Sequence, residues 1–293
     1  MILVAGATGQ LGGMIAGRLL DSGEEVSVLV RKGSDHAGLE AKGAQTRLGD
    51  LRDYDSLVRA CEGVRVVVST ANSAARGGDD NVDTVEIEGN SHLIDAARSA
   101  GVEHFIFVSA LGADLESPIP FMRGKAIAEH HLRESGMDYT ILQPNLFLEI
   151  WAGMLVAGPL LAGQPVTLIG EGTQRHSMIS VSDVASFAIA SIHRPEARNR
   201  TIALGGPEAL SWREVVTRFE KVTGREVEIR TVPVGSPLPG LPDVVTGLAT
   251  AFATFESPIP MEETARTLGV CLTPIESVIR QMMPPVEVTT LQG

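Results

Sequence analysis

A glycine-rich segment near residue 6 constrains the fold more than any other feature. Gly6, Gly9 and Gly12 follow the apolar run Ile2–Ala5 with the spacing GxxGxxG. Between a strand and a helix, such glycines permit a tight turn, close approach of a pyrophosphate, and close helix–strand packing. The helix N-terminus then offers free amides to the phosphates. We therefore expect dinucleotide contacts, with a purely structural glycine turn as the alternative, at Gly6, Thr8, Gly9, Gln10, Leu11 and Gly12.

Short apolar runs alternate with amphipathic stretches through the first half of the chain. The runs are rich in β-branched residues, and several are apolar on both faces, which is typical of buried parallel strands. We predict strands at Ile2–Ala5, Val26–Val30, Ala44–Leu48, Val64–Ser69, His104–Ser109 and Tyr139–Gln143. We predict helices at Gln10–Ser22, Tyr54–Cys61, Asn81–Ala100 and Lys125–Ser135. The alternation predicts an α/β fold with a Rossmann-type doubly wound parallel sheet.

The alternation lapses after Pro144, where glycine and proline become frequent. A later helix at Val184–His193 and a strand at Arg200–Leu204 resemble a return to the sheet, and two further helices are expected at Ser211–Thr223 and Ile275–Met282. We therefore predict a dinucleotide-binding domain at 1–145, with its sheet completed by about 180–206. A smaller, discontinuous C-terminal substrate domain would comprise 146–179 and 207–293.

The residues after the second predicted strand bear on the choice of cofactor. Arg31 and Lys32 follow Val26–Val30, where an NAD-binding protein usually has an acidic residue for the ribose hydroxyls. Two cations there favour a 2′-phosphate and hence NADPH, with NADH bound at least tenfold more weakly. A solvated basic loop is the alternative. Asp50, after the third strand, could accept a hydrogen bond from the adenine amine or cap a turn.

Composition excludes several classes of protein. The net charge of −12 predicts a poor binder of nucleic acid, because phosphate contact needs a basic face. Two cysteines, with no paired His or Cys spacing, predict neither a disulfide framework nor a metal site. No targeting segment is recognised, and the apolar stretch 151–163 is too short to span a membrane. We expect a cytoplasmic protein without membrane or nucleic-acid partners.

Several segments together resemble the NmrA-like group of atypical short-chain dehydrogenase/reductases. They are GATGQLGG at 6–13, VRK at 30–32, GD at 49–50, VSALGA at 108–113 and the more specific run at 125–149. The resemblance covers about residues 1–230. This group includes NAD(P)H-dependent quinone and dye reductases, relatives of isoflavone reductase, and redox sensors without known turnover. The resemblance implies a parallel sheet of order 3-2-1-4-5-6-7 with a small C-terminal substrate domain.

The resemblance also implies candidate catalytic residues. Ordinary members of the superfamily use a Tyr-x-x-x-Lys pair with a serine; Lys125 and Ser109 match the lysine and the serine, but Phe121 stands in place of the tyrosine. Lys125 would hold the nicotinamide ribose, with an ordinary surface lysine as the alternative. Besides Ser109 and Lys125, further cofactor contacts are expected at the carboxyl ends of strands, at Leu51, Thr70, Ala71, Asn72, Pro144 and Asn145.

An apolar segment after the sixth strand suggests a flat, apolar substrate. Candidate substrate contacts are Phe121, Phe147, Trp151 and His176, with core packing or, for His176, loop solvation as alternatives. We therefore expect NADPH-dependent hydride transfer to a small, apolar, conjugated acceptor such as a quinone or enone, without the usual tyrosine. The alternatives are a non-catalytic NADP(H)-binding redox sensor and an isomerase or lyase on the same fold. Monomer and homodimer both remain open.

Overall fold

The computed structural model describes residues 1–74, 77–238, 240–241 and 243–283. These residues form two compact units. Unit 1 comprises Met1–Pro144, Val181–Leu204 and Glu263–Cys271; unit 2 comprises Asn145–Ser180, Gly205–Glu262 and the described part of Leu272–Gly293. The segment Glu263–Cys271 therefore lies in unit 1, although the sequence analysis assigns it to the smaller domain. Residues 284–293 of that predicted domain lie outside the described residues.

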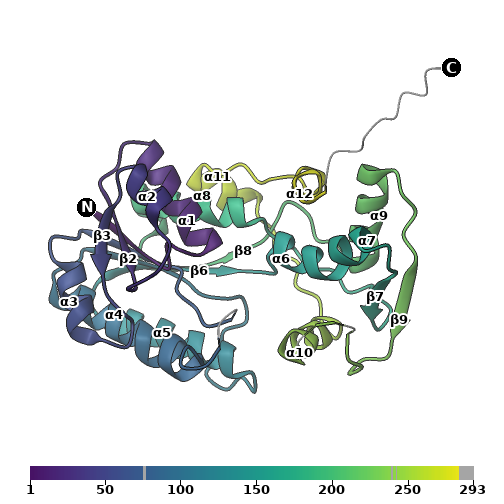
Figure 1. Cartoon of the computed structure of the whole chain (residues 1–293), viewed down its shortest axis with the longest axis horizontal. Helices are drawn as coiled ribbons and strands as arrows, with labels where there is room; N and C mark the ends of the chain where they lie inside the picture. Colours follow the sequence, from purple (N-terminus) through teal and green to yellow (C-terminus); the bar gives the residue numbers. More distant parts are fainter. Residues whose placement is uncertain (75–76, 239, 242, 284–293) are drawn as a thin grey trace. The chain divides into compact units, whose positions relative to one another are not determined.

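A seven-stranded parallel sheet forms the centre of unit 1 (Figure 1). Its order is β3-β2-β1-β4-β5-β6-β8. The strands are β1 (Ile2–Ala5), β2 (Val26–Val30), β3 (Gln45–Leu48), β4 (Val66–Ser69), β5 (His104–Val108), β6 (Asp138–Pro144) and β8 (Arg200–Leu204). Since β8 is the seventh strand of this sheet along the chain, the predicted order is confirmed. The first strand lies inside the sheet, between β2 and β4.

Helices cover both faces of this sheet, as a doubly wound fold requires. Figure 1 shows α1 and α8 on one face and α3, α4 and α5 on the other. The helical segments of unit 1 are α1 (Gln10–Asp21), α2 (Ala37–Ala41), α3 (Tyr54–Cys61), η1 (Val82–Ile87), α4 (Glu88–Ser99), α5 (Pro120–Glu134), α8 (Val181–His193) and η3 (Pro195–Ala197), with most of α11 (Glu262–Leu268). The predicted Rossmann-type fold is confirmed.

The core of unit 1 explains why its strands are apolar on both faces. Alternate strand residues, including Leu3, Val67 and Phe105, pack with Leu57 and Leu93 of the helices on one face. The intervening residues are buried beneath the other layer, and every residue of β1, β2, β4 and β5 is buried. A strand buried on both faces cannot show a polar–apolar alternation, so its continuous apolar run was the correct signal.

The predicted helix Asn81–Ala100 consists of two segments instead of one. The wide-turned η1 precedes α4 and begins at a capping box, in which Asn81 and Thr84 each hydrogen-bond the other's backbone amide at 3.1 Å. A Cβ atom on Gly89 would lie only 2.8 Å from the Thr84 carbonyl oxygen. Because glycine has no Cβ, the backbone of Gly89 can lie this close to Thr84 in the wide-turned segment η1. This segment contains Glu86.

Unit 2 contains two short strands that the sequence analysis did not predict. They are β7 (Val166–Ile169) and β9 (Ile229–Val232), which pair in parallel. The helical segments are α6 (Leu148–Ala152), η2 (Gly153–Ala157), α7 (Gly158–Leu161), α9 (Trp212–Thr223), α10 (Asp243–Phe252) and α12 (Ile275–Met282). A separate apolar core, which includes Leu155, Leu168 and Phe219, holds the unit together. In the described part of the chain, no helix combines the length and apolar character needed to cross a bilayer.

Candidate functional site

The loop between β1 and α1 has the geometry that its glycines predict. Gly6 has a φ of +81°, a backbone conformation that residues other than glycine rarely adopt. A Cβ on Gly6 would lie 2.6 Å from Oγ1 of Thr70, and one on Gly12 would lie 2.3 Å from the Gly6 carbonyl oxygen. Both positions therefore require glycine for the turn and for the close approach of α1.

The N-terminus of α1 is suited to an anionic ligand. Gly9 occupies the N-cap, so no side chain accepts from the first amides, and the first turn contains no acidic residue. Thr8, Gly9 and Gln10 are exposed there, and Leu11 is half-buried. Unpaired amides at the positive end of a twelve-residue helix favour phosphate. The cradle thus fits the pyrophosphate of a dinucleotide.

Arg31 lies at the end of β2, but its guanidinium already has a carboxylate partner. Nη1 of Arg31 is 2.8 Å and 3.0 Å from the two carboxylate oxygens of Asp80. Lys32 is exposed beside it in the sequence. These cations remain predicted contacts for a 2′-phosphate. The ion pair of Arg31 with Asp80 was not predicted from the sequence.

Asp50 closes a turn after β3. Its Oδ1 accepts from the backbone amide of Arg52 at 3.0 Å, and its Oδ2 accepts from Nη2 of the same residue at 2.9 Å. The hydrogen bond from the Arg52 side chain is the main reason that the pKa of Asp50 lies below its usual value. Leu51 is half-buried and adjoins Gly89. The geometry supports the turn-capping alternative for Asp50, and its contact with adenine stays a prediction.

The residues after β4 form a tight local turn. Thr70 donates from Oγ1 to the Ala5 carbonyl at 3.2 Å, which ties the end of β4 to that of β1. Asn72 donates from Nδ2 to the Thr70 carbonyl at 3.2 Å and accepts from the Ala74 amide at 3.1 Å. Ala71 lies between them and is half-buried. These three residues lie at the carboxyl edge of the sheet, where open α/β sheets bind their ligands.

Lys125 is buried on α5, which excludes the alternative of a surface lysine. Its Nζ lies 3.0 Å from Oε2 of Glu86 on η1, and 2% of its side chain is exposed. The same nitrogen donates to the carbonyl of Val108, the last residue of β5, at 3.3 Å. Oε2 of Glu86 has no hydrogen-bond partner among the described residues, so its contact with Lys125 is an ion pair without a hydrogen bond. An ammonium has three donors, and the bond to Val108 uses one of them.

Two aromatic rings lie close to Lys125, and hydrogen bonds from Ser73 hold its partner Glu86. Nζ lies 4.9 Å from the centre of the Phe107 ring and 5.5 Å from that of Phe121. Oε1 of Glu86 accepts from the amide and hydroxyl of Ser73, at 2.6 and 2.9 Å. Phe121 therefore lies where the resemblance places a tyrosine, close to the ammonium but without a proton to donate.

Ser109 follows β5 and belongs to a separate hydrogen-bond network. Its hydroxyl donates to Oε1 of Glu129 at 2.5 Å, and the Gln143 amide donates to the same oxygen at 2.8 Å. Arg133 donates to the other Glu129 oxygen at 2.8 Å. The Ser109 hydroxyl is thus engaged with α5, and its catalytic role stays a prediction.

The remaining predicted site residues lie along the chain after β6. Pro144 ends β6, and its carbonyl accepts from the Leu111 amide at 3.0 Å. In unit 2, Asn145 donates from Nδ2 to the carbonyl and hydroxyl oxygens of Ser257, both at 3.0 Å. Phe147 caps α6, and Trp151, half-buried, makes an edge-on contact with Phe252.

His176 is completely buried in unit 2, so loop solvation does not describe it. Its Nε2 is 3.0 Å from the Phe252 carbonyl, which can only accept, and its Nδ1 is 2.7 Å from the Ser257 hydroxyl. The ring therefore donates from Nε2, and in its neutral form Nδ1 accepts from the Ser257 hydroxyl. Burial lowers the pKa of His176. This arrangement fastens the segment 252–257, and contact with a substrate stays a prediction.

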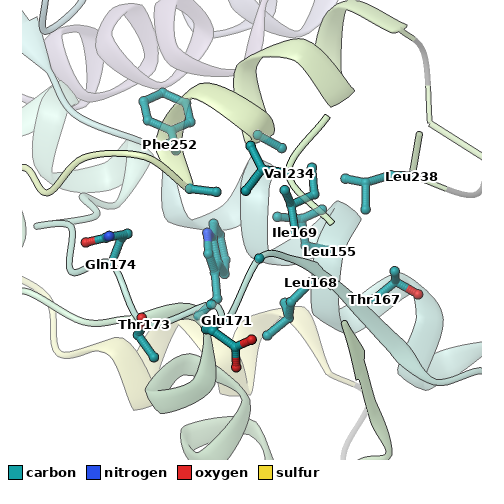
Figure 2. A pocket seen from close by; sticks show the side chains of 15 residues that line it. Leu155, Thr167, Leu168, Ile169, Glu171, Thr173, Gln174, Val234, Leu238 and Phe252 are labelled. Atoms are coloured by element: carbon teal, nitrogen blue, oxygen red, sulfur yellow. The ribbon is translucent and has the colours of Figure 1, made fainter. Parts of the chain in front are cut away.

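A cavity of about 300 Å³ lies within unit 2. Leu155, Ile169 and Leu238 lie together along one part of it, and Glu171, Thr173 and Gln174 lie along another (Figure 2). Phe252 also lines it and connects it to Trp151 through their ring contact. None of the four predicted substrate residues lines this cavity. The cavity offers an apolar wall with a polar edge, which suits a small aromatic ligand.

Two buried carboxylates, Glu86 and Glu129, were not predicted from the sequence. Both lie on the apolar stripe of a predicted helix: Glu86 adjoins Val85 and is four residues after Val82, and Glu129 is three residues before Leu132. A charged residue on an apolar stripe is the signal that could have identified them. Among the described residues, no group of His, Cys, Asp or Glu side chains could hold a metal ion.

Comparison with known proteins agrees with this geometry. A family model described as NAD(P)H-binding matches residues 6–195. Photosystem II assembly factor Ycf39 of Cyanophora paradoxa is 36% identical over 233 residues, which are 80% of this chain and 72% of that protein. The NAD(P)H azoreductase of Xenophilus azovorans is 31% identical over 235 residues, which are 78% and 75% of the two chains.

A solved structure extends the comparison to nearly the whole fold. The triphenylmethane reductase of Citrobacter sp., complexed with NADP(H), superposes with a TM-score of 0.81 at 23% identity. The match covers 97% of this chain and all of that chain. At this identity, the likeness establishes the common fold.

Proposed function

The chain belongs to the NAD(P)H-binding family of atypical short-chain dehydrogenase/reductases, and from this premise we propose that it is an NADPH-dependent reductase of an apolar, conjugated acceptor. The observation that carries the proposal is the pairing of Phe121 with the buried Lys125 on α5. The relatives named as azoreductase and triphenylmethane reductase support it, since both names denote conjugated dyes.

Residues of unit 1 would hold the cofactor. The amides at the start of α1, between Gly9 and Gly12, would bind the pyrophosphate, and Arg31 with Lys32 would bind the 2′-phosphate. An N–H of Lys125 that does not bind Val108 would bind a ribose hydroxyl at the carboxyl end of β5. NADPH, when bound there, supplies a hydride, which transfers one proton and two electrons to the acceptor.

The absence of a tyrosine limits which acceptors this site can reduce. A simple ketone needs a positioned proton donor as its oxygen becomes an alkoxide. Phe121 cannot donate a proton, and the ammonium of Lys125 has Glu86 as its counter-ion. A quinone, azo dye or extended enone delocalises the charge of its reduced anion, so water can supply the second proton later. The site therefore favours acceptors of that class.

An acceptor series tests this proposal. Purified protein is mixed with NADPH and, in turn, a quinone, an azo dye, an enone and a saturated ketone, and the loss of NADPH absorbance is followed. We expect oxidation with the conjugated acceptors and none with the ketone. If the ketone oxidises NADPH about as fast as the conjugated acceptors do, the claim that Phe121 restricts the site to conjugated acceptors is wrong.

A second candidate function is a cofactor-dependent regulator that turns nothing over. Two observations favour it: the charge of Lys125 is balanced internally by Glu86, and a relative at 36% identity is named as an assembly factor. A regulator of this kind would bind NADPH and NADP⁺ with different affinities and would oxidise NADPH with none of the acceptors. The same purified protein therefore distinguishes the two functions.

A further inference from the structure

The structure assigns a further role at the cofactor site: we propose that Asp80 is a specificity-determining residue that weakens binding of 2′-phosphorylated cofactor at Arg31. This inference rests on the proposed NADPH site. It concerns a residue outside the glycine loop and the strand ends, in the segment between β4 and η1. Its consequence is that the chain distinguishes NADPH from NADH less sharply than Arg31 and Lys32 alone would allow.

The contact itself is close and uses the group that a 2′-phosphate would need. Both carboxylate oxygens of Asp80 lie within 3.0 Å of Nη1 of Arg31. The Asp80 side chain is 14% exposed, whereas that of Arg31 is 38% exposed. The carboxylate is thus largely shielded from solvent, whereas more than a third of the Arg31 side chain is exposed. A phosphate that approaches Arg31 must meet this negative charge.

The backbone around Asp80 is held in place by the start of η1. Asn81, the next residue, is the N-cap of η1 and exchanges hydrogen bonds of 3.1 Å with Thr84. The Thr84 hydroxyl also donates to the Asp79 carbonyl at 2.6 Å. Because the residues on both sides of Asp80 are tied to the same turn, its carboxylate is positioned beside Arg31 by the fold.

Two further carboxylates lie beside the neighbouring cation Arg52. Arg52 lies 2.9 Å from a carboxylate oxygen of Asp50 and 3.9 Å from one of Asp79. Among the described residues, three carboxylates therefore lie beside the cations Arg31 and Arg52. A phosphate group at Arg31 would meet these negative charges, although phosphate sites gain most from an excess of cations.

Neutralising Asp80 tests the inference. We expect Asp80→Asn to tighten NADPH binding about fivefold at low ionic strength, the size of effect expected for one ion pair with the partly exposed Arg31, and to leave NADH binding unchanged. The gain should shrink as salt is added, because salt screens exposed charges. Titration calorimetry with each cofactor measures both affinities, and thermal unfolding verifies that the variant folds.

Asp79→Asn is the matched control. It removes the same charge one residue away, but the Asp79 side chain is 95% exposed and faces Arg52 at 3.9 Å. We expect less than a twofold change for this variant. Equal gains in the two variants would show a general charge effect and would overturn the role of Asp80. Unchanged NADPH affinity in Asp80→Asn would also overturn it, and weaker affinity would make Asp80 a residue that orients Arg31 for binding.

Arg31→Ala separates this inference from the proposed cofactor site. If Arg31→Ala weakens NADPH binding while Asp80→Asn has no effect, the site stands and the role of Asp80 fails. If Arg31→Ala leaves NADPH binding unchanged, the 2′-phosphate site and the role of Asp80 fail together. The inference expects Asp80→Asn to lose its effect when Arg31→Ala is already present, since the competition acts through that guanidinium.

Discussion

Nζ of Lys125 lies 3.0 Å from Oε2 of Glu86, and both side chains are almost wholly buried. A neighbouring glycine makes this contact possible. A Cβ on Gly124 would lie 2.8 Å from that of Glu86, so the missing side chain lets α5 approach η1. The lysine that the resemblance places in the active site is thus half of a buried ion pair between two helical segments.

The ion pair predicts how substitutions at Lys125 affect stability. Lys125→Met leaves the Glu86 carboxylate buried without its cation, and we expect a loss of about 3–5 kcal/mol in the free energy of unfolding. Glu86→Gln leaves the ammonium without its counter-ion and should also destabilise. The double variant removes both charges and keeps the oxygen that accepts from Ser73, so it should recover most of the loss. Urea unfolding of the four proteins measures the coupling.

An exposed pair of a lysine and a carboxylate provides the control. Lys42 lies 3.0 Å from Asp21, but their side chains are 49% and 63% exposed. We expect Lys42→Met to cost less than about 1 kcal/mol. Additive effects of Lys125→Met and Glu86→Gln would contradict the account of the buried pair.

Replacing both predicted phosphate contacts should change cofactor choice. We expect Arg31→Ala with Lys32→Ala to weaken NADPH binding by about tenfold or more, which is about 1.4 kcal/mol, and to leave NADH binding almost unchanged. The reason is that only NADPH carries the 2′-phosphate. Fluorescence titration of each cofactor measures the effect. Equal losses for NADPH and NADH would place the phosphate elsewhere.

Much of the fold could be predicted from local patterns. The strands of the sheet and the glycine loop depend on apolar runs and on glycines with short-range roles, such as Gly6 and Gly12, whereas the strand order followed from the family resemblance. Strand β9 was missed because it places exposed Arg230 and Thr231 between its end residues, and β7 because its four residues lie where glycine and proline interrupt the alternation of strands and helices. Such short strands are defined by their pairing with each other rather than by their own sequences.

The candidate site was less predictable because its contacts join distant residues. Lys125 could be named from its place in a family motif, but its partner Glu86 is 39 residues away in the sequence. Asp80 pairs with Arg31 across 49 residues in the same way. No local spacing encodes either pair. The packing of η1 against α5 brings Lys125 and Glu86 together, and the course of the chain before η1 brings Asp80 to Arg31.

Phe121→Tyr should extend the range of acceptors. The ring centre lies 5.5 Å from Nζ of Lys125, so a hydroxyl on this ring would be near a cation that favours proton donation. We expect a measurable rate with a saturated ketone that the native protein does not reduce. Phe121→Leu, which removes the ring without adding a hydroxyl, is the control and should show no such gain. Equal ketone rates in the two variants would exclude proton donation from this position.

His104 predicts a loss of stability in mild acid. The Thr140 hydroxyl donates to the Ala197 carbonyl and so accepts from Nε2 of His104, while Nδ1 is buried without a hydrogen-bond partner among the described residues. Burial is the main cause that lowers the pKa of His104 to about 4 from an ordinary 6.5. Between these values the unfolded chain binds a proton that the folded chain excludes, so stability falls as pH decreases.

Urea unfolding at two pH values measures this effect. From about pH 7.5 to about pH 5, the histidine alone should cost about 2 kcal/mol, and His104→Gln should lose this part of the pH dependence. The exposed His130 is the control, because His130→Gln should leave the pH dependence unchanged. A native protein with the same pH dependence as His104→Gln would show that His104 protonates freely in the folded state.

The rate of NADPH oxidation with a quinone tests the central claim most directly. The native protein is compared with the double variant Lys125→Met, Glu86→Gln, in which the buried charges are removed together so that the fold is kept. We predict acceptor-dependent oxidation by the native protein and a rate about a hundredfold lower in the double variant, a typical loss for a positioned catalytic group. A native protein that binds NADPH but oxidises it with neither quinone nor dye would contradict the claim.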